Sequence, residues 1–392
     1  MSENAPVRPP ADPAAARPPA DRAARPASRG IAIVGRLALV GLSSLLALGV
    51  AELGYRARTA RDETPDGDDG GWRDRYRHMN ETIYRASSID GLVYEPTPGA
   101  SVEMEYGAAG FDAAGMRDDE EHALTPDPSR TRVAIVGDSI VWSEFLPLWD
   151  SLPERVEESL GRERFEVLPF GVSGYDTTQE AIWYEHAARP FQPAIVVVVW
   201  CMNDFVIMSG PFERFATGRD REEKDAQDAW LEEVAPVRRE TIDWVGQERE
   251  EAATFRVLAH AENLYERWRF ERDYVDEYLL AFAEPSRRER ASHAIARLGG
   301  AIREDHARGL FVISPVLEQW DHYRWQALHD FVAEEAERAG FTVLDLREAL
   351  AGRDPETLRI GGDNLHYGRT GTRVIASEIA DAITSLDGVH GP

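Results

Sequence analysis

Apolar and polar positions alternate in blocks from residue 131 onward, and the blocks have the lengths of strands and helices. The run "PAIVVVVWCMND" (193–204) is too uniformly apolar to have a solvent-facing side. It therefore predicts a central strand of a parallel sheet that helices cover on both faces. Four other short runs predict further strands: "TRVAIVGDS" (131–139), "FEVLPFGVSG" (165–174), "GLFVISPV" (309–316) and "FTVLDL" (341–346).

Between these runs, apolar residues recur with the spacing of amphipathic helices. "SLPERVEESLGRE" (151–163) is apolar at every fourth residue, and "TTQEAIWYEHAAR" predicts a second helix that Thr177 or Thr178 would cap. Three later segments have the same pattern: 286–307, 323–340, which Gly340 would end, and 371–386. Repeated strand–helix units predict an α/β fold, a three-layer α/β/α sandwich around a parallel five-stranded sheet with right-handed crossovers.

The alternation is interrupted between about residues 206 and 284. Charged, helix-prone segments such as "FERFATGRDREEKDAQDAWLEEV" fill this stretch and contain no strand pattern. We interpret it as a helical insertion into the α/β domain. Two interpretations stay open: a lid that shapes the substrate site, or a solvated set of helices that only packs on the domain.

An apolar block lies near the N-terminus, before all of these elements. Residues 1–30 are rich in Pro, Ala and Arg and are predicted to be disordered. The uncharged run 37–51 is about 22 Å long as a helix, short of a hydrocarbon slab of about 30 Å. Residues 31–35 restore the length if the Arg36 side chain extends toward the lipid headgroups. The sequence therefore predicts a transmembrane segment over 31–52.

Arginines precede this segment, which favours a cytoplasmic N-terminus and an exported remainder. We expect an uncleaved signal anchor, because the leader is long for a signal peptide. A signal peptide cleaved after "GVA", before Glu52, is the main alternative and would give a secreted protein. A buried helix of a soluble protein is the other.

Residues 53–130 carry weaker patterns. "DETPDGDDGGW" (62–72) is acidic and Gly-rich, and because its spacing does not match a calcium loop we interpret it as a solvated linker. "GLVYEPTPGASVEMEYGAAGFDAAGMRDDEE" (91–121) predicts short extended pieces joined by Gly and Pro turns. The chain thus divides into four parts: a tail (1–30), an anchor (31–52), a linker with extended pieces (53–130) and an α/β domain with its insertion (131–385).

Composition narrows the classes of function. The net charge of -26 argues against a nucleic-acid partner, because phosphate binding needs clustered Lys and Arg. Cys201 is the single cysteine of the chain, so neither an intramolecular disulfide nor a cysteine-based zinc site is possible. His322 and His329, seven residues apart on one predicted helix face, are too few ligands for a metal. We therefore expect no metal and no cofactor.

Residues with matching chemistry follow three of the predicted strands and precede the last helix. Ser139 follows the first strand, Gly174 the second and Asn203 the third, and "GGDNLHYGRTG" carries Asp363 and His366. Because the carboxyl ends of parallel strands share one edge of a sheet, we expect these residues to meet there.

Together they are the components of acyl transfer. A serine hydroxyl attacks only after a base takes its proton; His366 would be that base, and Asp363 would orient its imidazole. The N–H of Ser139, the N–H of Gly174 and the amide of Asn203 would stabilise the oxyanion. The simplest competing interpretation of Ser139 is a helix cap.

The blocks "GDS", "GVSGYDT", "MND" and "DNLH", in this order, resemble those of the SGNH hydrolases, also called GDSL-type esterases and lipases. The resemblance covers about residues 131–385 and implies a flavodoxin-like fold. The lead-in "GMRDDEE" (115–121) is similar to one common among bacterial members. The resemblance implies these roles: Ser139 as nucleophile, Ser139, Gly174 and Asn203 as oxyanion hole, and Asp363 and His366 as the rest of the triad.

Two positions depart from the family pattern. Cys201 stands where the third block usually has glycine, and Trp142 and Ser143 replace a small or glycine-rich turn. These departures bear on the shape of the substrate site more than on activity. Asp138 and Asp204 we assign to loop hydrogen bonds.

The resemblance implies a serine esterase or deacylase that hydrolyses carboxylic esters. From the N-terminal apolar segment and the arginines ahead of it, we expect the enzyme to be held in a bacterial inner membrane with its catalytic domain periplasmic or extracellular. An O-acyltransferase that acts on cell-envelope glycan with the same triad stays open, as does a catalytically silent binding module. The expected partners are a small-molecule, lipid or glycan ester and, through the N-terminal helix, the membrane.

Overall fold

A parallel sheet of five strands lies at the centre of the computed structural model, which describes residues 28–62, 69–207, 211–234, 253–273, 276–318, 320–361 and 364–387. The strands are β5 (Thr131–Gly137), β6 (Phe165–Gly171), β7 (Ile195–Trp200), β8 (Arg308–Ile313) and β9 (Thr342–Asp345). Each of the five apolar runs predicted to be strands forms one of them. The predicted α/β fold with a five-stranded parallel sheet is confirmed.

The order of the strands in the sheet is β6–β5–β7–β8–β9. From β5 the chain crosses to the edge strand β6, then returns past β5 to β7 and continues in the opposite direction to β9. In open α/β sheets, ligands bind at such a reversal, outside the carboxyl ends of the strands. Ser139 follows β5 directly and therefore lies at the reversal.

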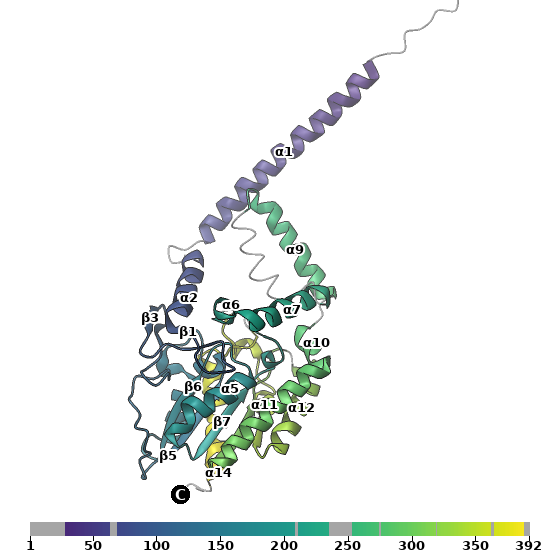
Figure 1. The fold of residues 1–392 in the computed structure, drawn as a ribbon. Coiled ribbons are helices and arrows are strands. Elements are labelled where there is room, and N and C mark those ends of the chain that lie inside the picture. The colour runs from purple at the N-terminus through teal and green to yellow at the C-terminus, as the bar shows by residue number, and fades with distance from the viewer. Residues whose placement is uncertain are drawn as a thin grey trace, which may run out of the picture.

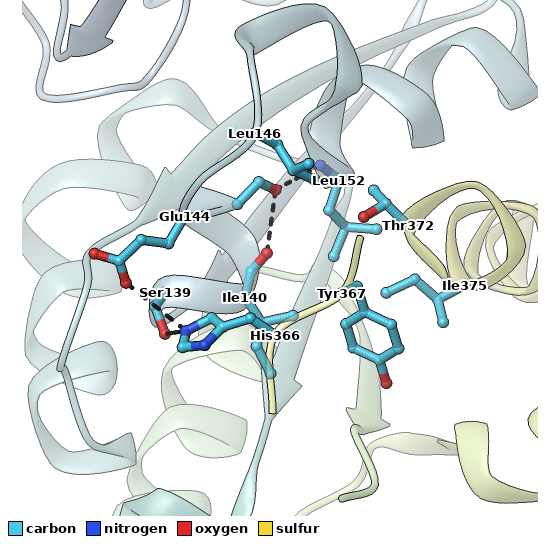
Figure 2. A pocket seen from close by; sticks show the side chains of 10 residues that line it. Ser139, Ile140, Glu144, Leu146, Leu152, His366, Tyr367, Thr372 and Ile375 are labelled. Carbon is cyan, nitrogen blue, oxygen red and sulfur yellow. Dashed lines mark hydrogen bonds and ion pairs between the residues drawn. The ribbon is translucent and has the colours of Figure 1, made fainter. Parts of the chain in front are cut away.

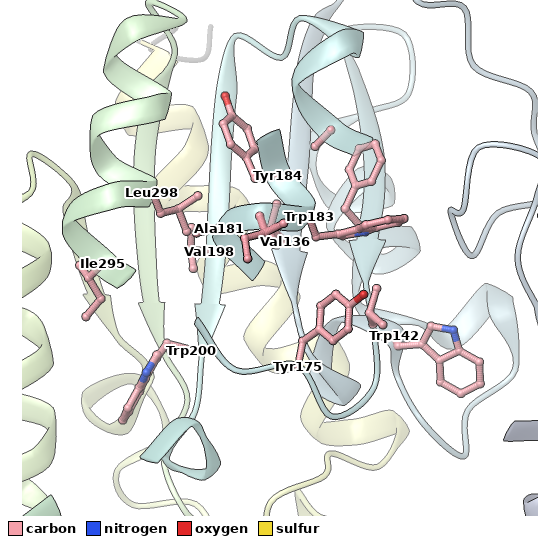
Figure 3. Close-up of a cluster of buried hydrophobic side chains, with 14 of the residues drawn as sticks. Val136, Trp142, Tyr175, Ala181, Trp183, Tyr184, Val198, Trp200, Ile295 and Leu298 are labelled. Carbon is pink, nitrogen blue, oxygen red and sulfur yellow. The ribbon is translucent and has the colours of Figure 1, made fainter. Parts of the chain in front are cut away.

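Helices cover both faces of the sheet (Figure 1). One face carries α5 (Thr177–Trp183), α11 (Pro285–Glu304) and α12 (Gln326–Arg338), and the other carries α4 (Leu152–Leu160) and α14 (Arg369–Asp387). Because side chains alternate along a strand, Val136 and Val133 of β5 belong to different cores. Figure 3 shows the first core, where Val136 and Val198 of the sheet lie near Ala181 of α5 and Leu298 of α11.

A helix and two antiparallel hairpins precede the sheet. The hairpins pair β1 (Tyr84–Ala86) with β2 (Tyr94–Pro96), and β3 (Ser101–Met104) with β4 (Gly107–Gly110). The second hairpin and β2 lie where short extended pieces were expected. The helix α2 (Asp69–Ile83) was not predicted, and residues 69–72 are helical rather than linker. Met79 and Ile83, four residues apart, are fully buried, so tertiary packing stabilises this otherwise polar helix.

Most of the described residues of the insertion are helical, and no strand lies among them. Its helices are α6 (Pro211–Phe215), α7 (Gly218–Val234), α9 (Arg256–Asp273) and α10 (Glu277–Ala283). Helix α10 packs on the domain, where the Phe282 ring lies 5.6 Å from that of Phe205 and 5.5 Å from that of Phe331. Helix α9 leaves the domain and lies against the N-terminal helix (Figure 1). Helix α10 therefore packs on the α/β domain, whereas α9 connects the insertion to the N-terminal helix.

The N-terminal helix α1 (Ser28–Asp62) projects from the body as a single rod (Figure 1). It begins within the tail predicted to be disordered, because residues 28–30 are helical; residues 1–27 lie outside the described part of the chain. Among the described residues, one stretch, Ala38–Ala57, is long and apolar enough to cross a membrane by length and composition. Leu46 and Leu53 expose 70% and 71% of their surface on it.

The cap predicted for α5 is wrong. Asp176, not Thr177 or Thr178, precedes the first turn, and its carboxylate accepts hydrogen bonds from the N–H groups of Thr178 and Gln179. The Gln179 side chain completes a capping box by accepting from the Asp176 N–H. A carboxylate satisfies two N–H donors at once, which a threonine hydroxyl does less well.

Helix α12 also starts later than predicted, at Gln326, although Gly340 follows its end with a φ of +90°, as expected. His322 lies in a separate 3-10 turn (Trp320–His322) ahead of the helix. His322 and His329 therefore do not share a helix face. The remaining short elements are α3 (Ser139–Trp142), α13 (Leu346–Leu350), a π-helical turn (Tyr184–Ala188) and 3-10 turns at Leu148–Asp150, Arg189–Phe191, Met202–Phe205 and Pro355–Thr357.

Candidate active site

Ser139 is the first residue of the one-turn helix α3, directly after β5. Gly137 allows the tight exit from the strand, because a Cβ there would lie 2.9 Å from the carbonyl oxygen of Val199. The Asp138 carboxylate caps α3 by accepting a hydrogen bond of 2.9 Å from the Ile140 N–H. Since Asp138 is the cap, the Ser139 hydroxyl is not used for capping and lines a pocket instead.

His366 meets Ser139 across the rim of the sheet. Its Nε2 lies 2.8 Å from the Ser139 Oγ, although the two residues are 227 positions apart (Figure 2). Backbone bonds fix the loop that carries the imidazole: Ile360 N–H donates to the His366 carbonyl at 3.0 Å, and Leu317 N–H donates to Asn364 at 2.7 Å. Asp363, the predicted partner of the imidazole, lies outside the described residues.

The predicted oxyanion donors lie at the same edge of the sheet. Gly174, between β6 and α5, has a φ of +80°, a conformation that favours glycine. Asn203 lies in the 3-10 turn after β7, and its Nδ2 donates a hydrogen bond of 2.8 Å to the Asp138 Oδ2. Asp138 therefore holds two features at once, the start of α3 and the Asn203 amide.

Cys201, the departure from the usual glycine, is part of this arrangement. The buried thiol lies against the Asn203 Oδ1 and 3.5 Å from the Asp138 Oδ2. Burial raises the pKa of the Cys201 thiol, so it stays neutral and can donate a hydrogen bond. Because the thiol binds the amide oxygen, the amide nitrogen turns toward Asp138. The larger side chain orients Asn203 rather than displacing it.

Glu144 is a site residue that the sequence analysis missed. Its carboxylate is 4% exposed, accepts a 3.1 Å hydrogen bond from the Ser173 Oγ and another from the Tyr76 hydroxyl, and lies 3.7 Å from the His366 Nε2. Burial raises the pKa of Glu144, while the nearby His366 opposes that rise. One signal in the sequence was available: an acid within the apolar stretch "SIVWSEFLPLW" directly after the serine.

Arg117 holds the loop that carries Glu144. Its guanidinium donates to the carbonyls of Trp142, Ser143 (2.9 Å) and Leu146 (2.6 Å) and lies 4.4 Å from the Trp142 ring centre. Ser143 has a φ of +57°, which costs free energy for a residue other than glycine and persists only where the surroundings fix it. Trp142 and Ser143, which depart from the family pattern, thus lie in a buried loop that Arg117 of the segment "GMRDDEE" holds in place.

Asp204 has the structural role assigned to it. It is buried and accepts a hydrogen bond from the Thr177 hydroxyl at the first turn of α5. Burial raises the pKa of its carboxyl group. Its contact ties the loop after β7 to the helix after β6, which keeps Asn203 and Gly174 at a fixed separation.

The pocket beside Ser139 is small, about 220 Å³ including the part open to solvent. Figure 2 shows Ser139, Glu144 and His366 at one side of it and apolar side chains at the other. The apolar wall consists of Ile140, Leu146, Leu152 and Ile375. The site combines a hydroxyl, an imidazole within hydrogen-bond distance of it and a small apolar pocket. These are the groups that acyl transfer requires.

A family model for the GDSL-like lipase/acylhydrolase family matches residues 135–374. Among solved structures, LAE5, an alpha/beta hydrolase from the metagenome of Lake Arreo, Spain, is 14% identical with a TM-score of 0.39, and the match covers 67% of this chain and 97% of that one. A catalytic mutant of Axe2, an acetylxylan esterase from Geobacillus stearothermophilus, is 14% identical with a TM-score of 0.39 and coverages of 65% and 94%. No curated protein matches the chain.

The matched region is well over half of the chain. It includes the loops that carry Ser139, Gly174, Asn203 and His366, in the order in which their sequence blocks resemble the family. The chain therefore belongs to the GDSL-like lipase/acylhydrolase family, whose members act on ester bonds.

Proposed function

We propose that the protein is a serine esterase that cleaves carboxylic esters through an acyl-enzyme on Ser139. The contact of 2.8 Å between the His366 Nε2 and the Ser139 Oγ carries the proposal. At this distance the imidazole takes the hydroxyl proton as Oγ attacks the ester carbon, and then gives it to the departing alcohol. Water next attacks the acyl carbon, its proton passes to His366, and Ser139 leaves with that proton.

The negative oxygen formed in both steps needs donors fixed in advance. We assign this role to the N–H groups of Ser139 and Gly174 and to the Asn203 amide. An amide nitrogen carries two hydrogens, so the bond from Asn203 to Asp138 orients the group while the second hydrogen serves the oxyanion. Asp363 keeps, in this proposal, its role of orienting the imidazole.

The acyl group of the substrate is short in this proposal. The pocket is small, because its volume of about 220 Å³ already includes the part open to solvent. Its apolar wall, with Leu146 and Leu152, favours a small acyl chain over a charged group. The alcohol part then lies outside the pocket, toward solvent.

We also propose that residues 31–52 anchor the enzyme and that the domain, residues 131–385, lies on the non-cytoplasmic side of the membrane. The exposed apolar surface of α1 and the arginines ahead of it support this arrangement. The α/β domain then acts outside the compartment in which the chain is made.

The test is Ser139→Ala assayed with p-nitrophenyl esters of increasing acyl length. Loss of at least about 1,000-fold in kcat is expected, because the hydroxyl forms the covalent bond. The wild type should react fastest with the shortest acyl groups and should be labelled by a fluorophosphonate at Ser139. A variant that keeps wild-type turnover would refute the assignment.

A further inference from the structure

Helix α9 of the insertion begins directly on the N-terminal helix. The Glu52 carboxylate of α1 accepts hydrogen bonds from the N–H groups of Arg256 (3.0 Å) and Val257 (2.8 Å), the first two residues of α9. Arg56 pairs with Glu52 and donates a 2.9 Å bond to the Thr254 carbonyl. A carboxylate that binds free N–H groups at a helix start is a specific cap. The contact between α1 and α9 is therefore made by specific hydrogen bonds and not by chance proximity.

Ring packing extends the same contact. The rings of Tyr55 and His260 lie 5.1 Å apart, one turn beyond the cap. On the side of α9 where Ala259 and Asn263 lie, the helix is buried (6% and 7% exposed). One side of α9 is therefore covered.

Other positions of α9 expose large apolar side chains. Leu258 and Tyr265 are 51% and 56% exposed, the neighbouring Leu264 is 54% exposed, and Phe255, directly ahead of the helix, is 45% exposed. A surface helix of a soluble domain usually shows charged residues there. The adjacent Phe255 and Leu258 form an exposed apolar surface of the kind that marks contact with another apolar surface.

The position of this surface identifies the partner. Val50 and Leu53 of α1, which flank Glu52, are 64% and 71% exposed and belong to the apolar stretch Ala38–Ala57. Because α9 starts at Glu52, the last residue of the proposed anchor, Phe255 and Leu258 lie at the level where the anchor ends. At a rise of about 1.5 Å per residue, Leu258 is within about 5 Å of this level along α9. Lipid that surrounds α1 therefore reaches these side chains.

The strong negative charge of the chain argues against general electrostatic attraction of the body to the membrane. With a net charge of -26, the body is repelled by anionic lipid headgroups rather than attracted. A stable orientation at the membrane then requires apolar contact, which Phe255 and Leu258 supply.

We propose that α9 is a membrane-interface strut: it binds α1 through Glu52 and inserts Phe255 and Leu258 into the headgroup region of the bilayer. The insertion thereby fixes the orientation of the catalytic domain relative to the membrane instead of covering the pocket. The inference rests on the proposed anchor but not on the proposed chemistry. Interfacial helices of this type place their apolar face about 5–10 Å into the boundary between headgroups and acyl chains.

The experiment uses the full chain in lipid vesicles, with a fluorophore attached at Leu258→Cys. The native Cys201 is 3% exposed and leaves little background labelling. The matched control is Leu124→Cys, which is 57% exposed and lies beside Arg132 at the start of β5. We expect lipids with a quencher near the headgroup to remove most of the emission at position 258 and little at position 124, and iodide in the water to do the reverse.

A second measurement tests the contact between the helices. A short bis-maleimide should join Tyr55→Cys to His260→Cys in the membrane but should not join Leu46→Cys to His260→Cys. Protein that floats with vesicles while the probe at 258 responds only to iodide would overturn the strut alone. Failure to float would overturn the anchor and the strut together, and neither result would change the outcome of the Ser139→Ala assay.

Discussion

Two carboxylates approach Ser139 from different sides. Asp138 points away from the pocket and binds the Asn203 amide and the start of α3, so it organises donors. Glu144 lines the pocket and lies near the nitrogen of His366 that contacts the serine. Asp138 therefore positions the groups of the site, while Glu144 affects the charge of the His366 imidazole.

Replacing Glu144 should change the pH dependence of catalysis. A negative charge 3.7 Å from the His366 Nε2 stabilises the protonated imidazole, which cannot act as base. In Glu144→Gln this stabilisation is lost, so the acid limb of kcat/KM should move to lower pH by about 1 unit. A pH–rate profile measures the shift. Glu158→Gln, 63% exposed on α4, should leave the acid limb unchanged.

Asn203→Ala tests the oxyanion assignment. Loss of one such donor typically lowers kcat by about 100-fold, or about 3 kcal/mol of transition-state stabilisation. The KM should change much less, because the oxyanion exists only in the transition state. If the melting temperature falls while kcat stays near the wild-type value, Asn203 has only the structural role of holding Asp138.

The residues of the site differ in how far the sequence could reveal them. Ser139, Gly174 and Asn203 each follow a recognisable strand, so their positions at one edge follow from the topology. Glu144 acquires its role from Tyr76 and Ser173, which are 68 and 29 residues away, and no local pattern encodes that meeting.

At the scale of elements, buried ion pairs and hydrogen bonds hold the segment ahead of β5 against the sheet. His122 lies between the carboxylates of Asp118 and Glu166, 3.0 Å from each, and its side chain is 5% exposed. Glu166 of β6 also accepts a 2.8 Å hydrogen bond from Arg132 of β5. This cluster holds in place the segment of the chain that leads from Arg117 to β5.

The cluster predicts a loss of stability in alkali. Burial works against the charged imidazole, but hydrogen bonds to Asp118 and Glu166 raise the pKa of His122 to about 9. A raised pKa contributes stability fully below the unfolded value of about 6.5, and this is lost as pH rises through 9. Urea unfolding should show the wild type losing about 2 kcal/mol between pH 6 and 10. His122→Asn should lose less over this range.

Elements with a uniform or periodic apolar pattern could be predicted, and elements fixed by distant partners could not. The strand β7 has no polar position and needs no context to be identified. Helix α2 has the polar sequence "DGGWRDRYRHMNETI", and its burial depends on contacts of Met79 and Ile83 with the hairpins and the core. Likewise, the four residues of α3 are too short for any helical period to appear.

At the scale of the whole molecule, the insertion leaves the sheet after the turn that carries Asn203, at the same edge as Ser139. Helix α2, which follows α1, also reaches this edge through Tyr76. Helix α1, the insertion and the candidate site are thus connected at one edge of the sheet. The sequence alone did not reveal this connection, because it depends on the placement of α9.

The proposed topology predicts on which side of the membrane the α/β domain is accessible. With the anchor uncleaved, a membrane-impermeant maleimide should label Leu124→Cys in spheroplasts and should label Ser2→Cys only in inside-out vesicles. Labelling of Leu124→Cys only in inside-out vesicles would contradict the orientation. Loss of Ser2→Cys from the mature protein would instead indicate cleavage.

The hydrogen bond from Tyr76 to Glu144 also limits where the enzyme can work. Tyr76 lies in α2, which starts at Asp69, and the connection from the end of α1 at Asp62 can reach at most about 25 Å. With α1 in a bilayer, Ser139 stays within a few tens of ångströms of the lipid surface. Esters retained at the cell surface then meet it at a high effective concentration, whereas a freely diffusing ester gains nothing from the tether.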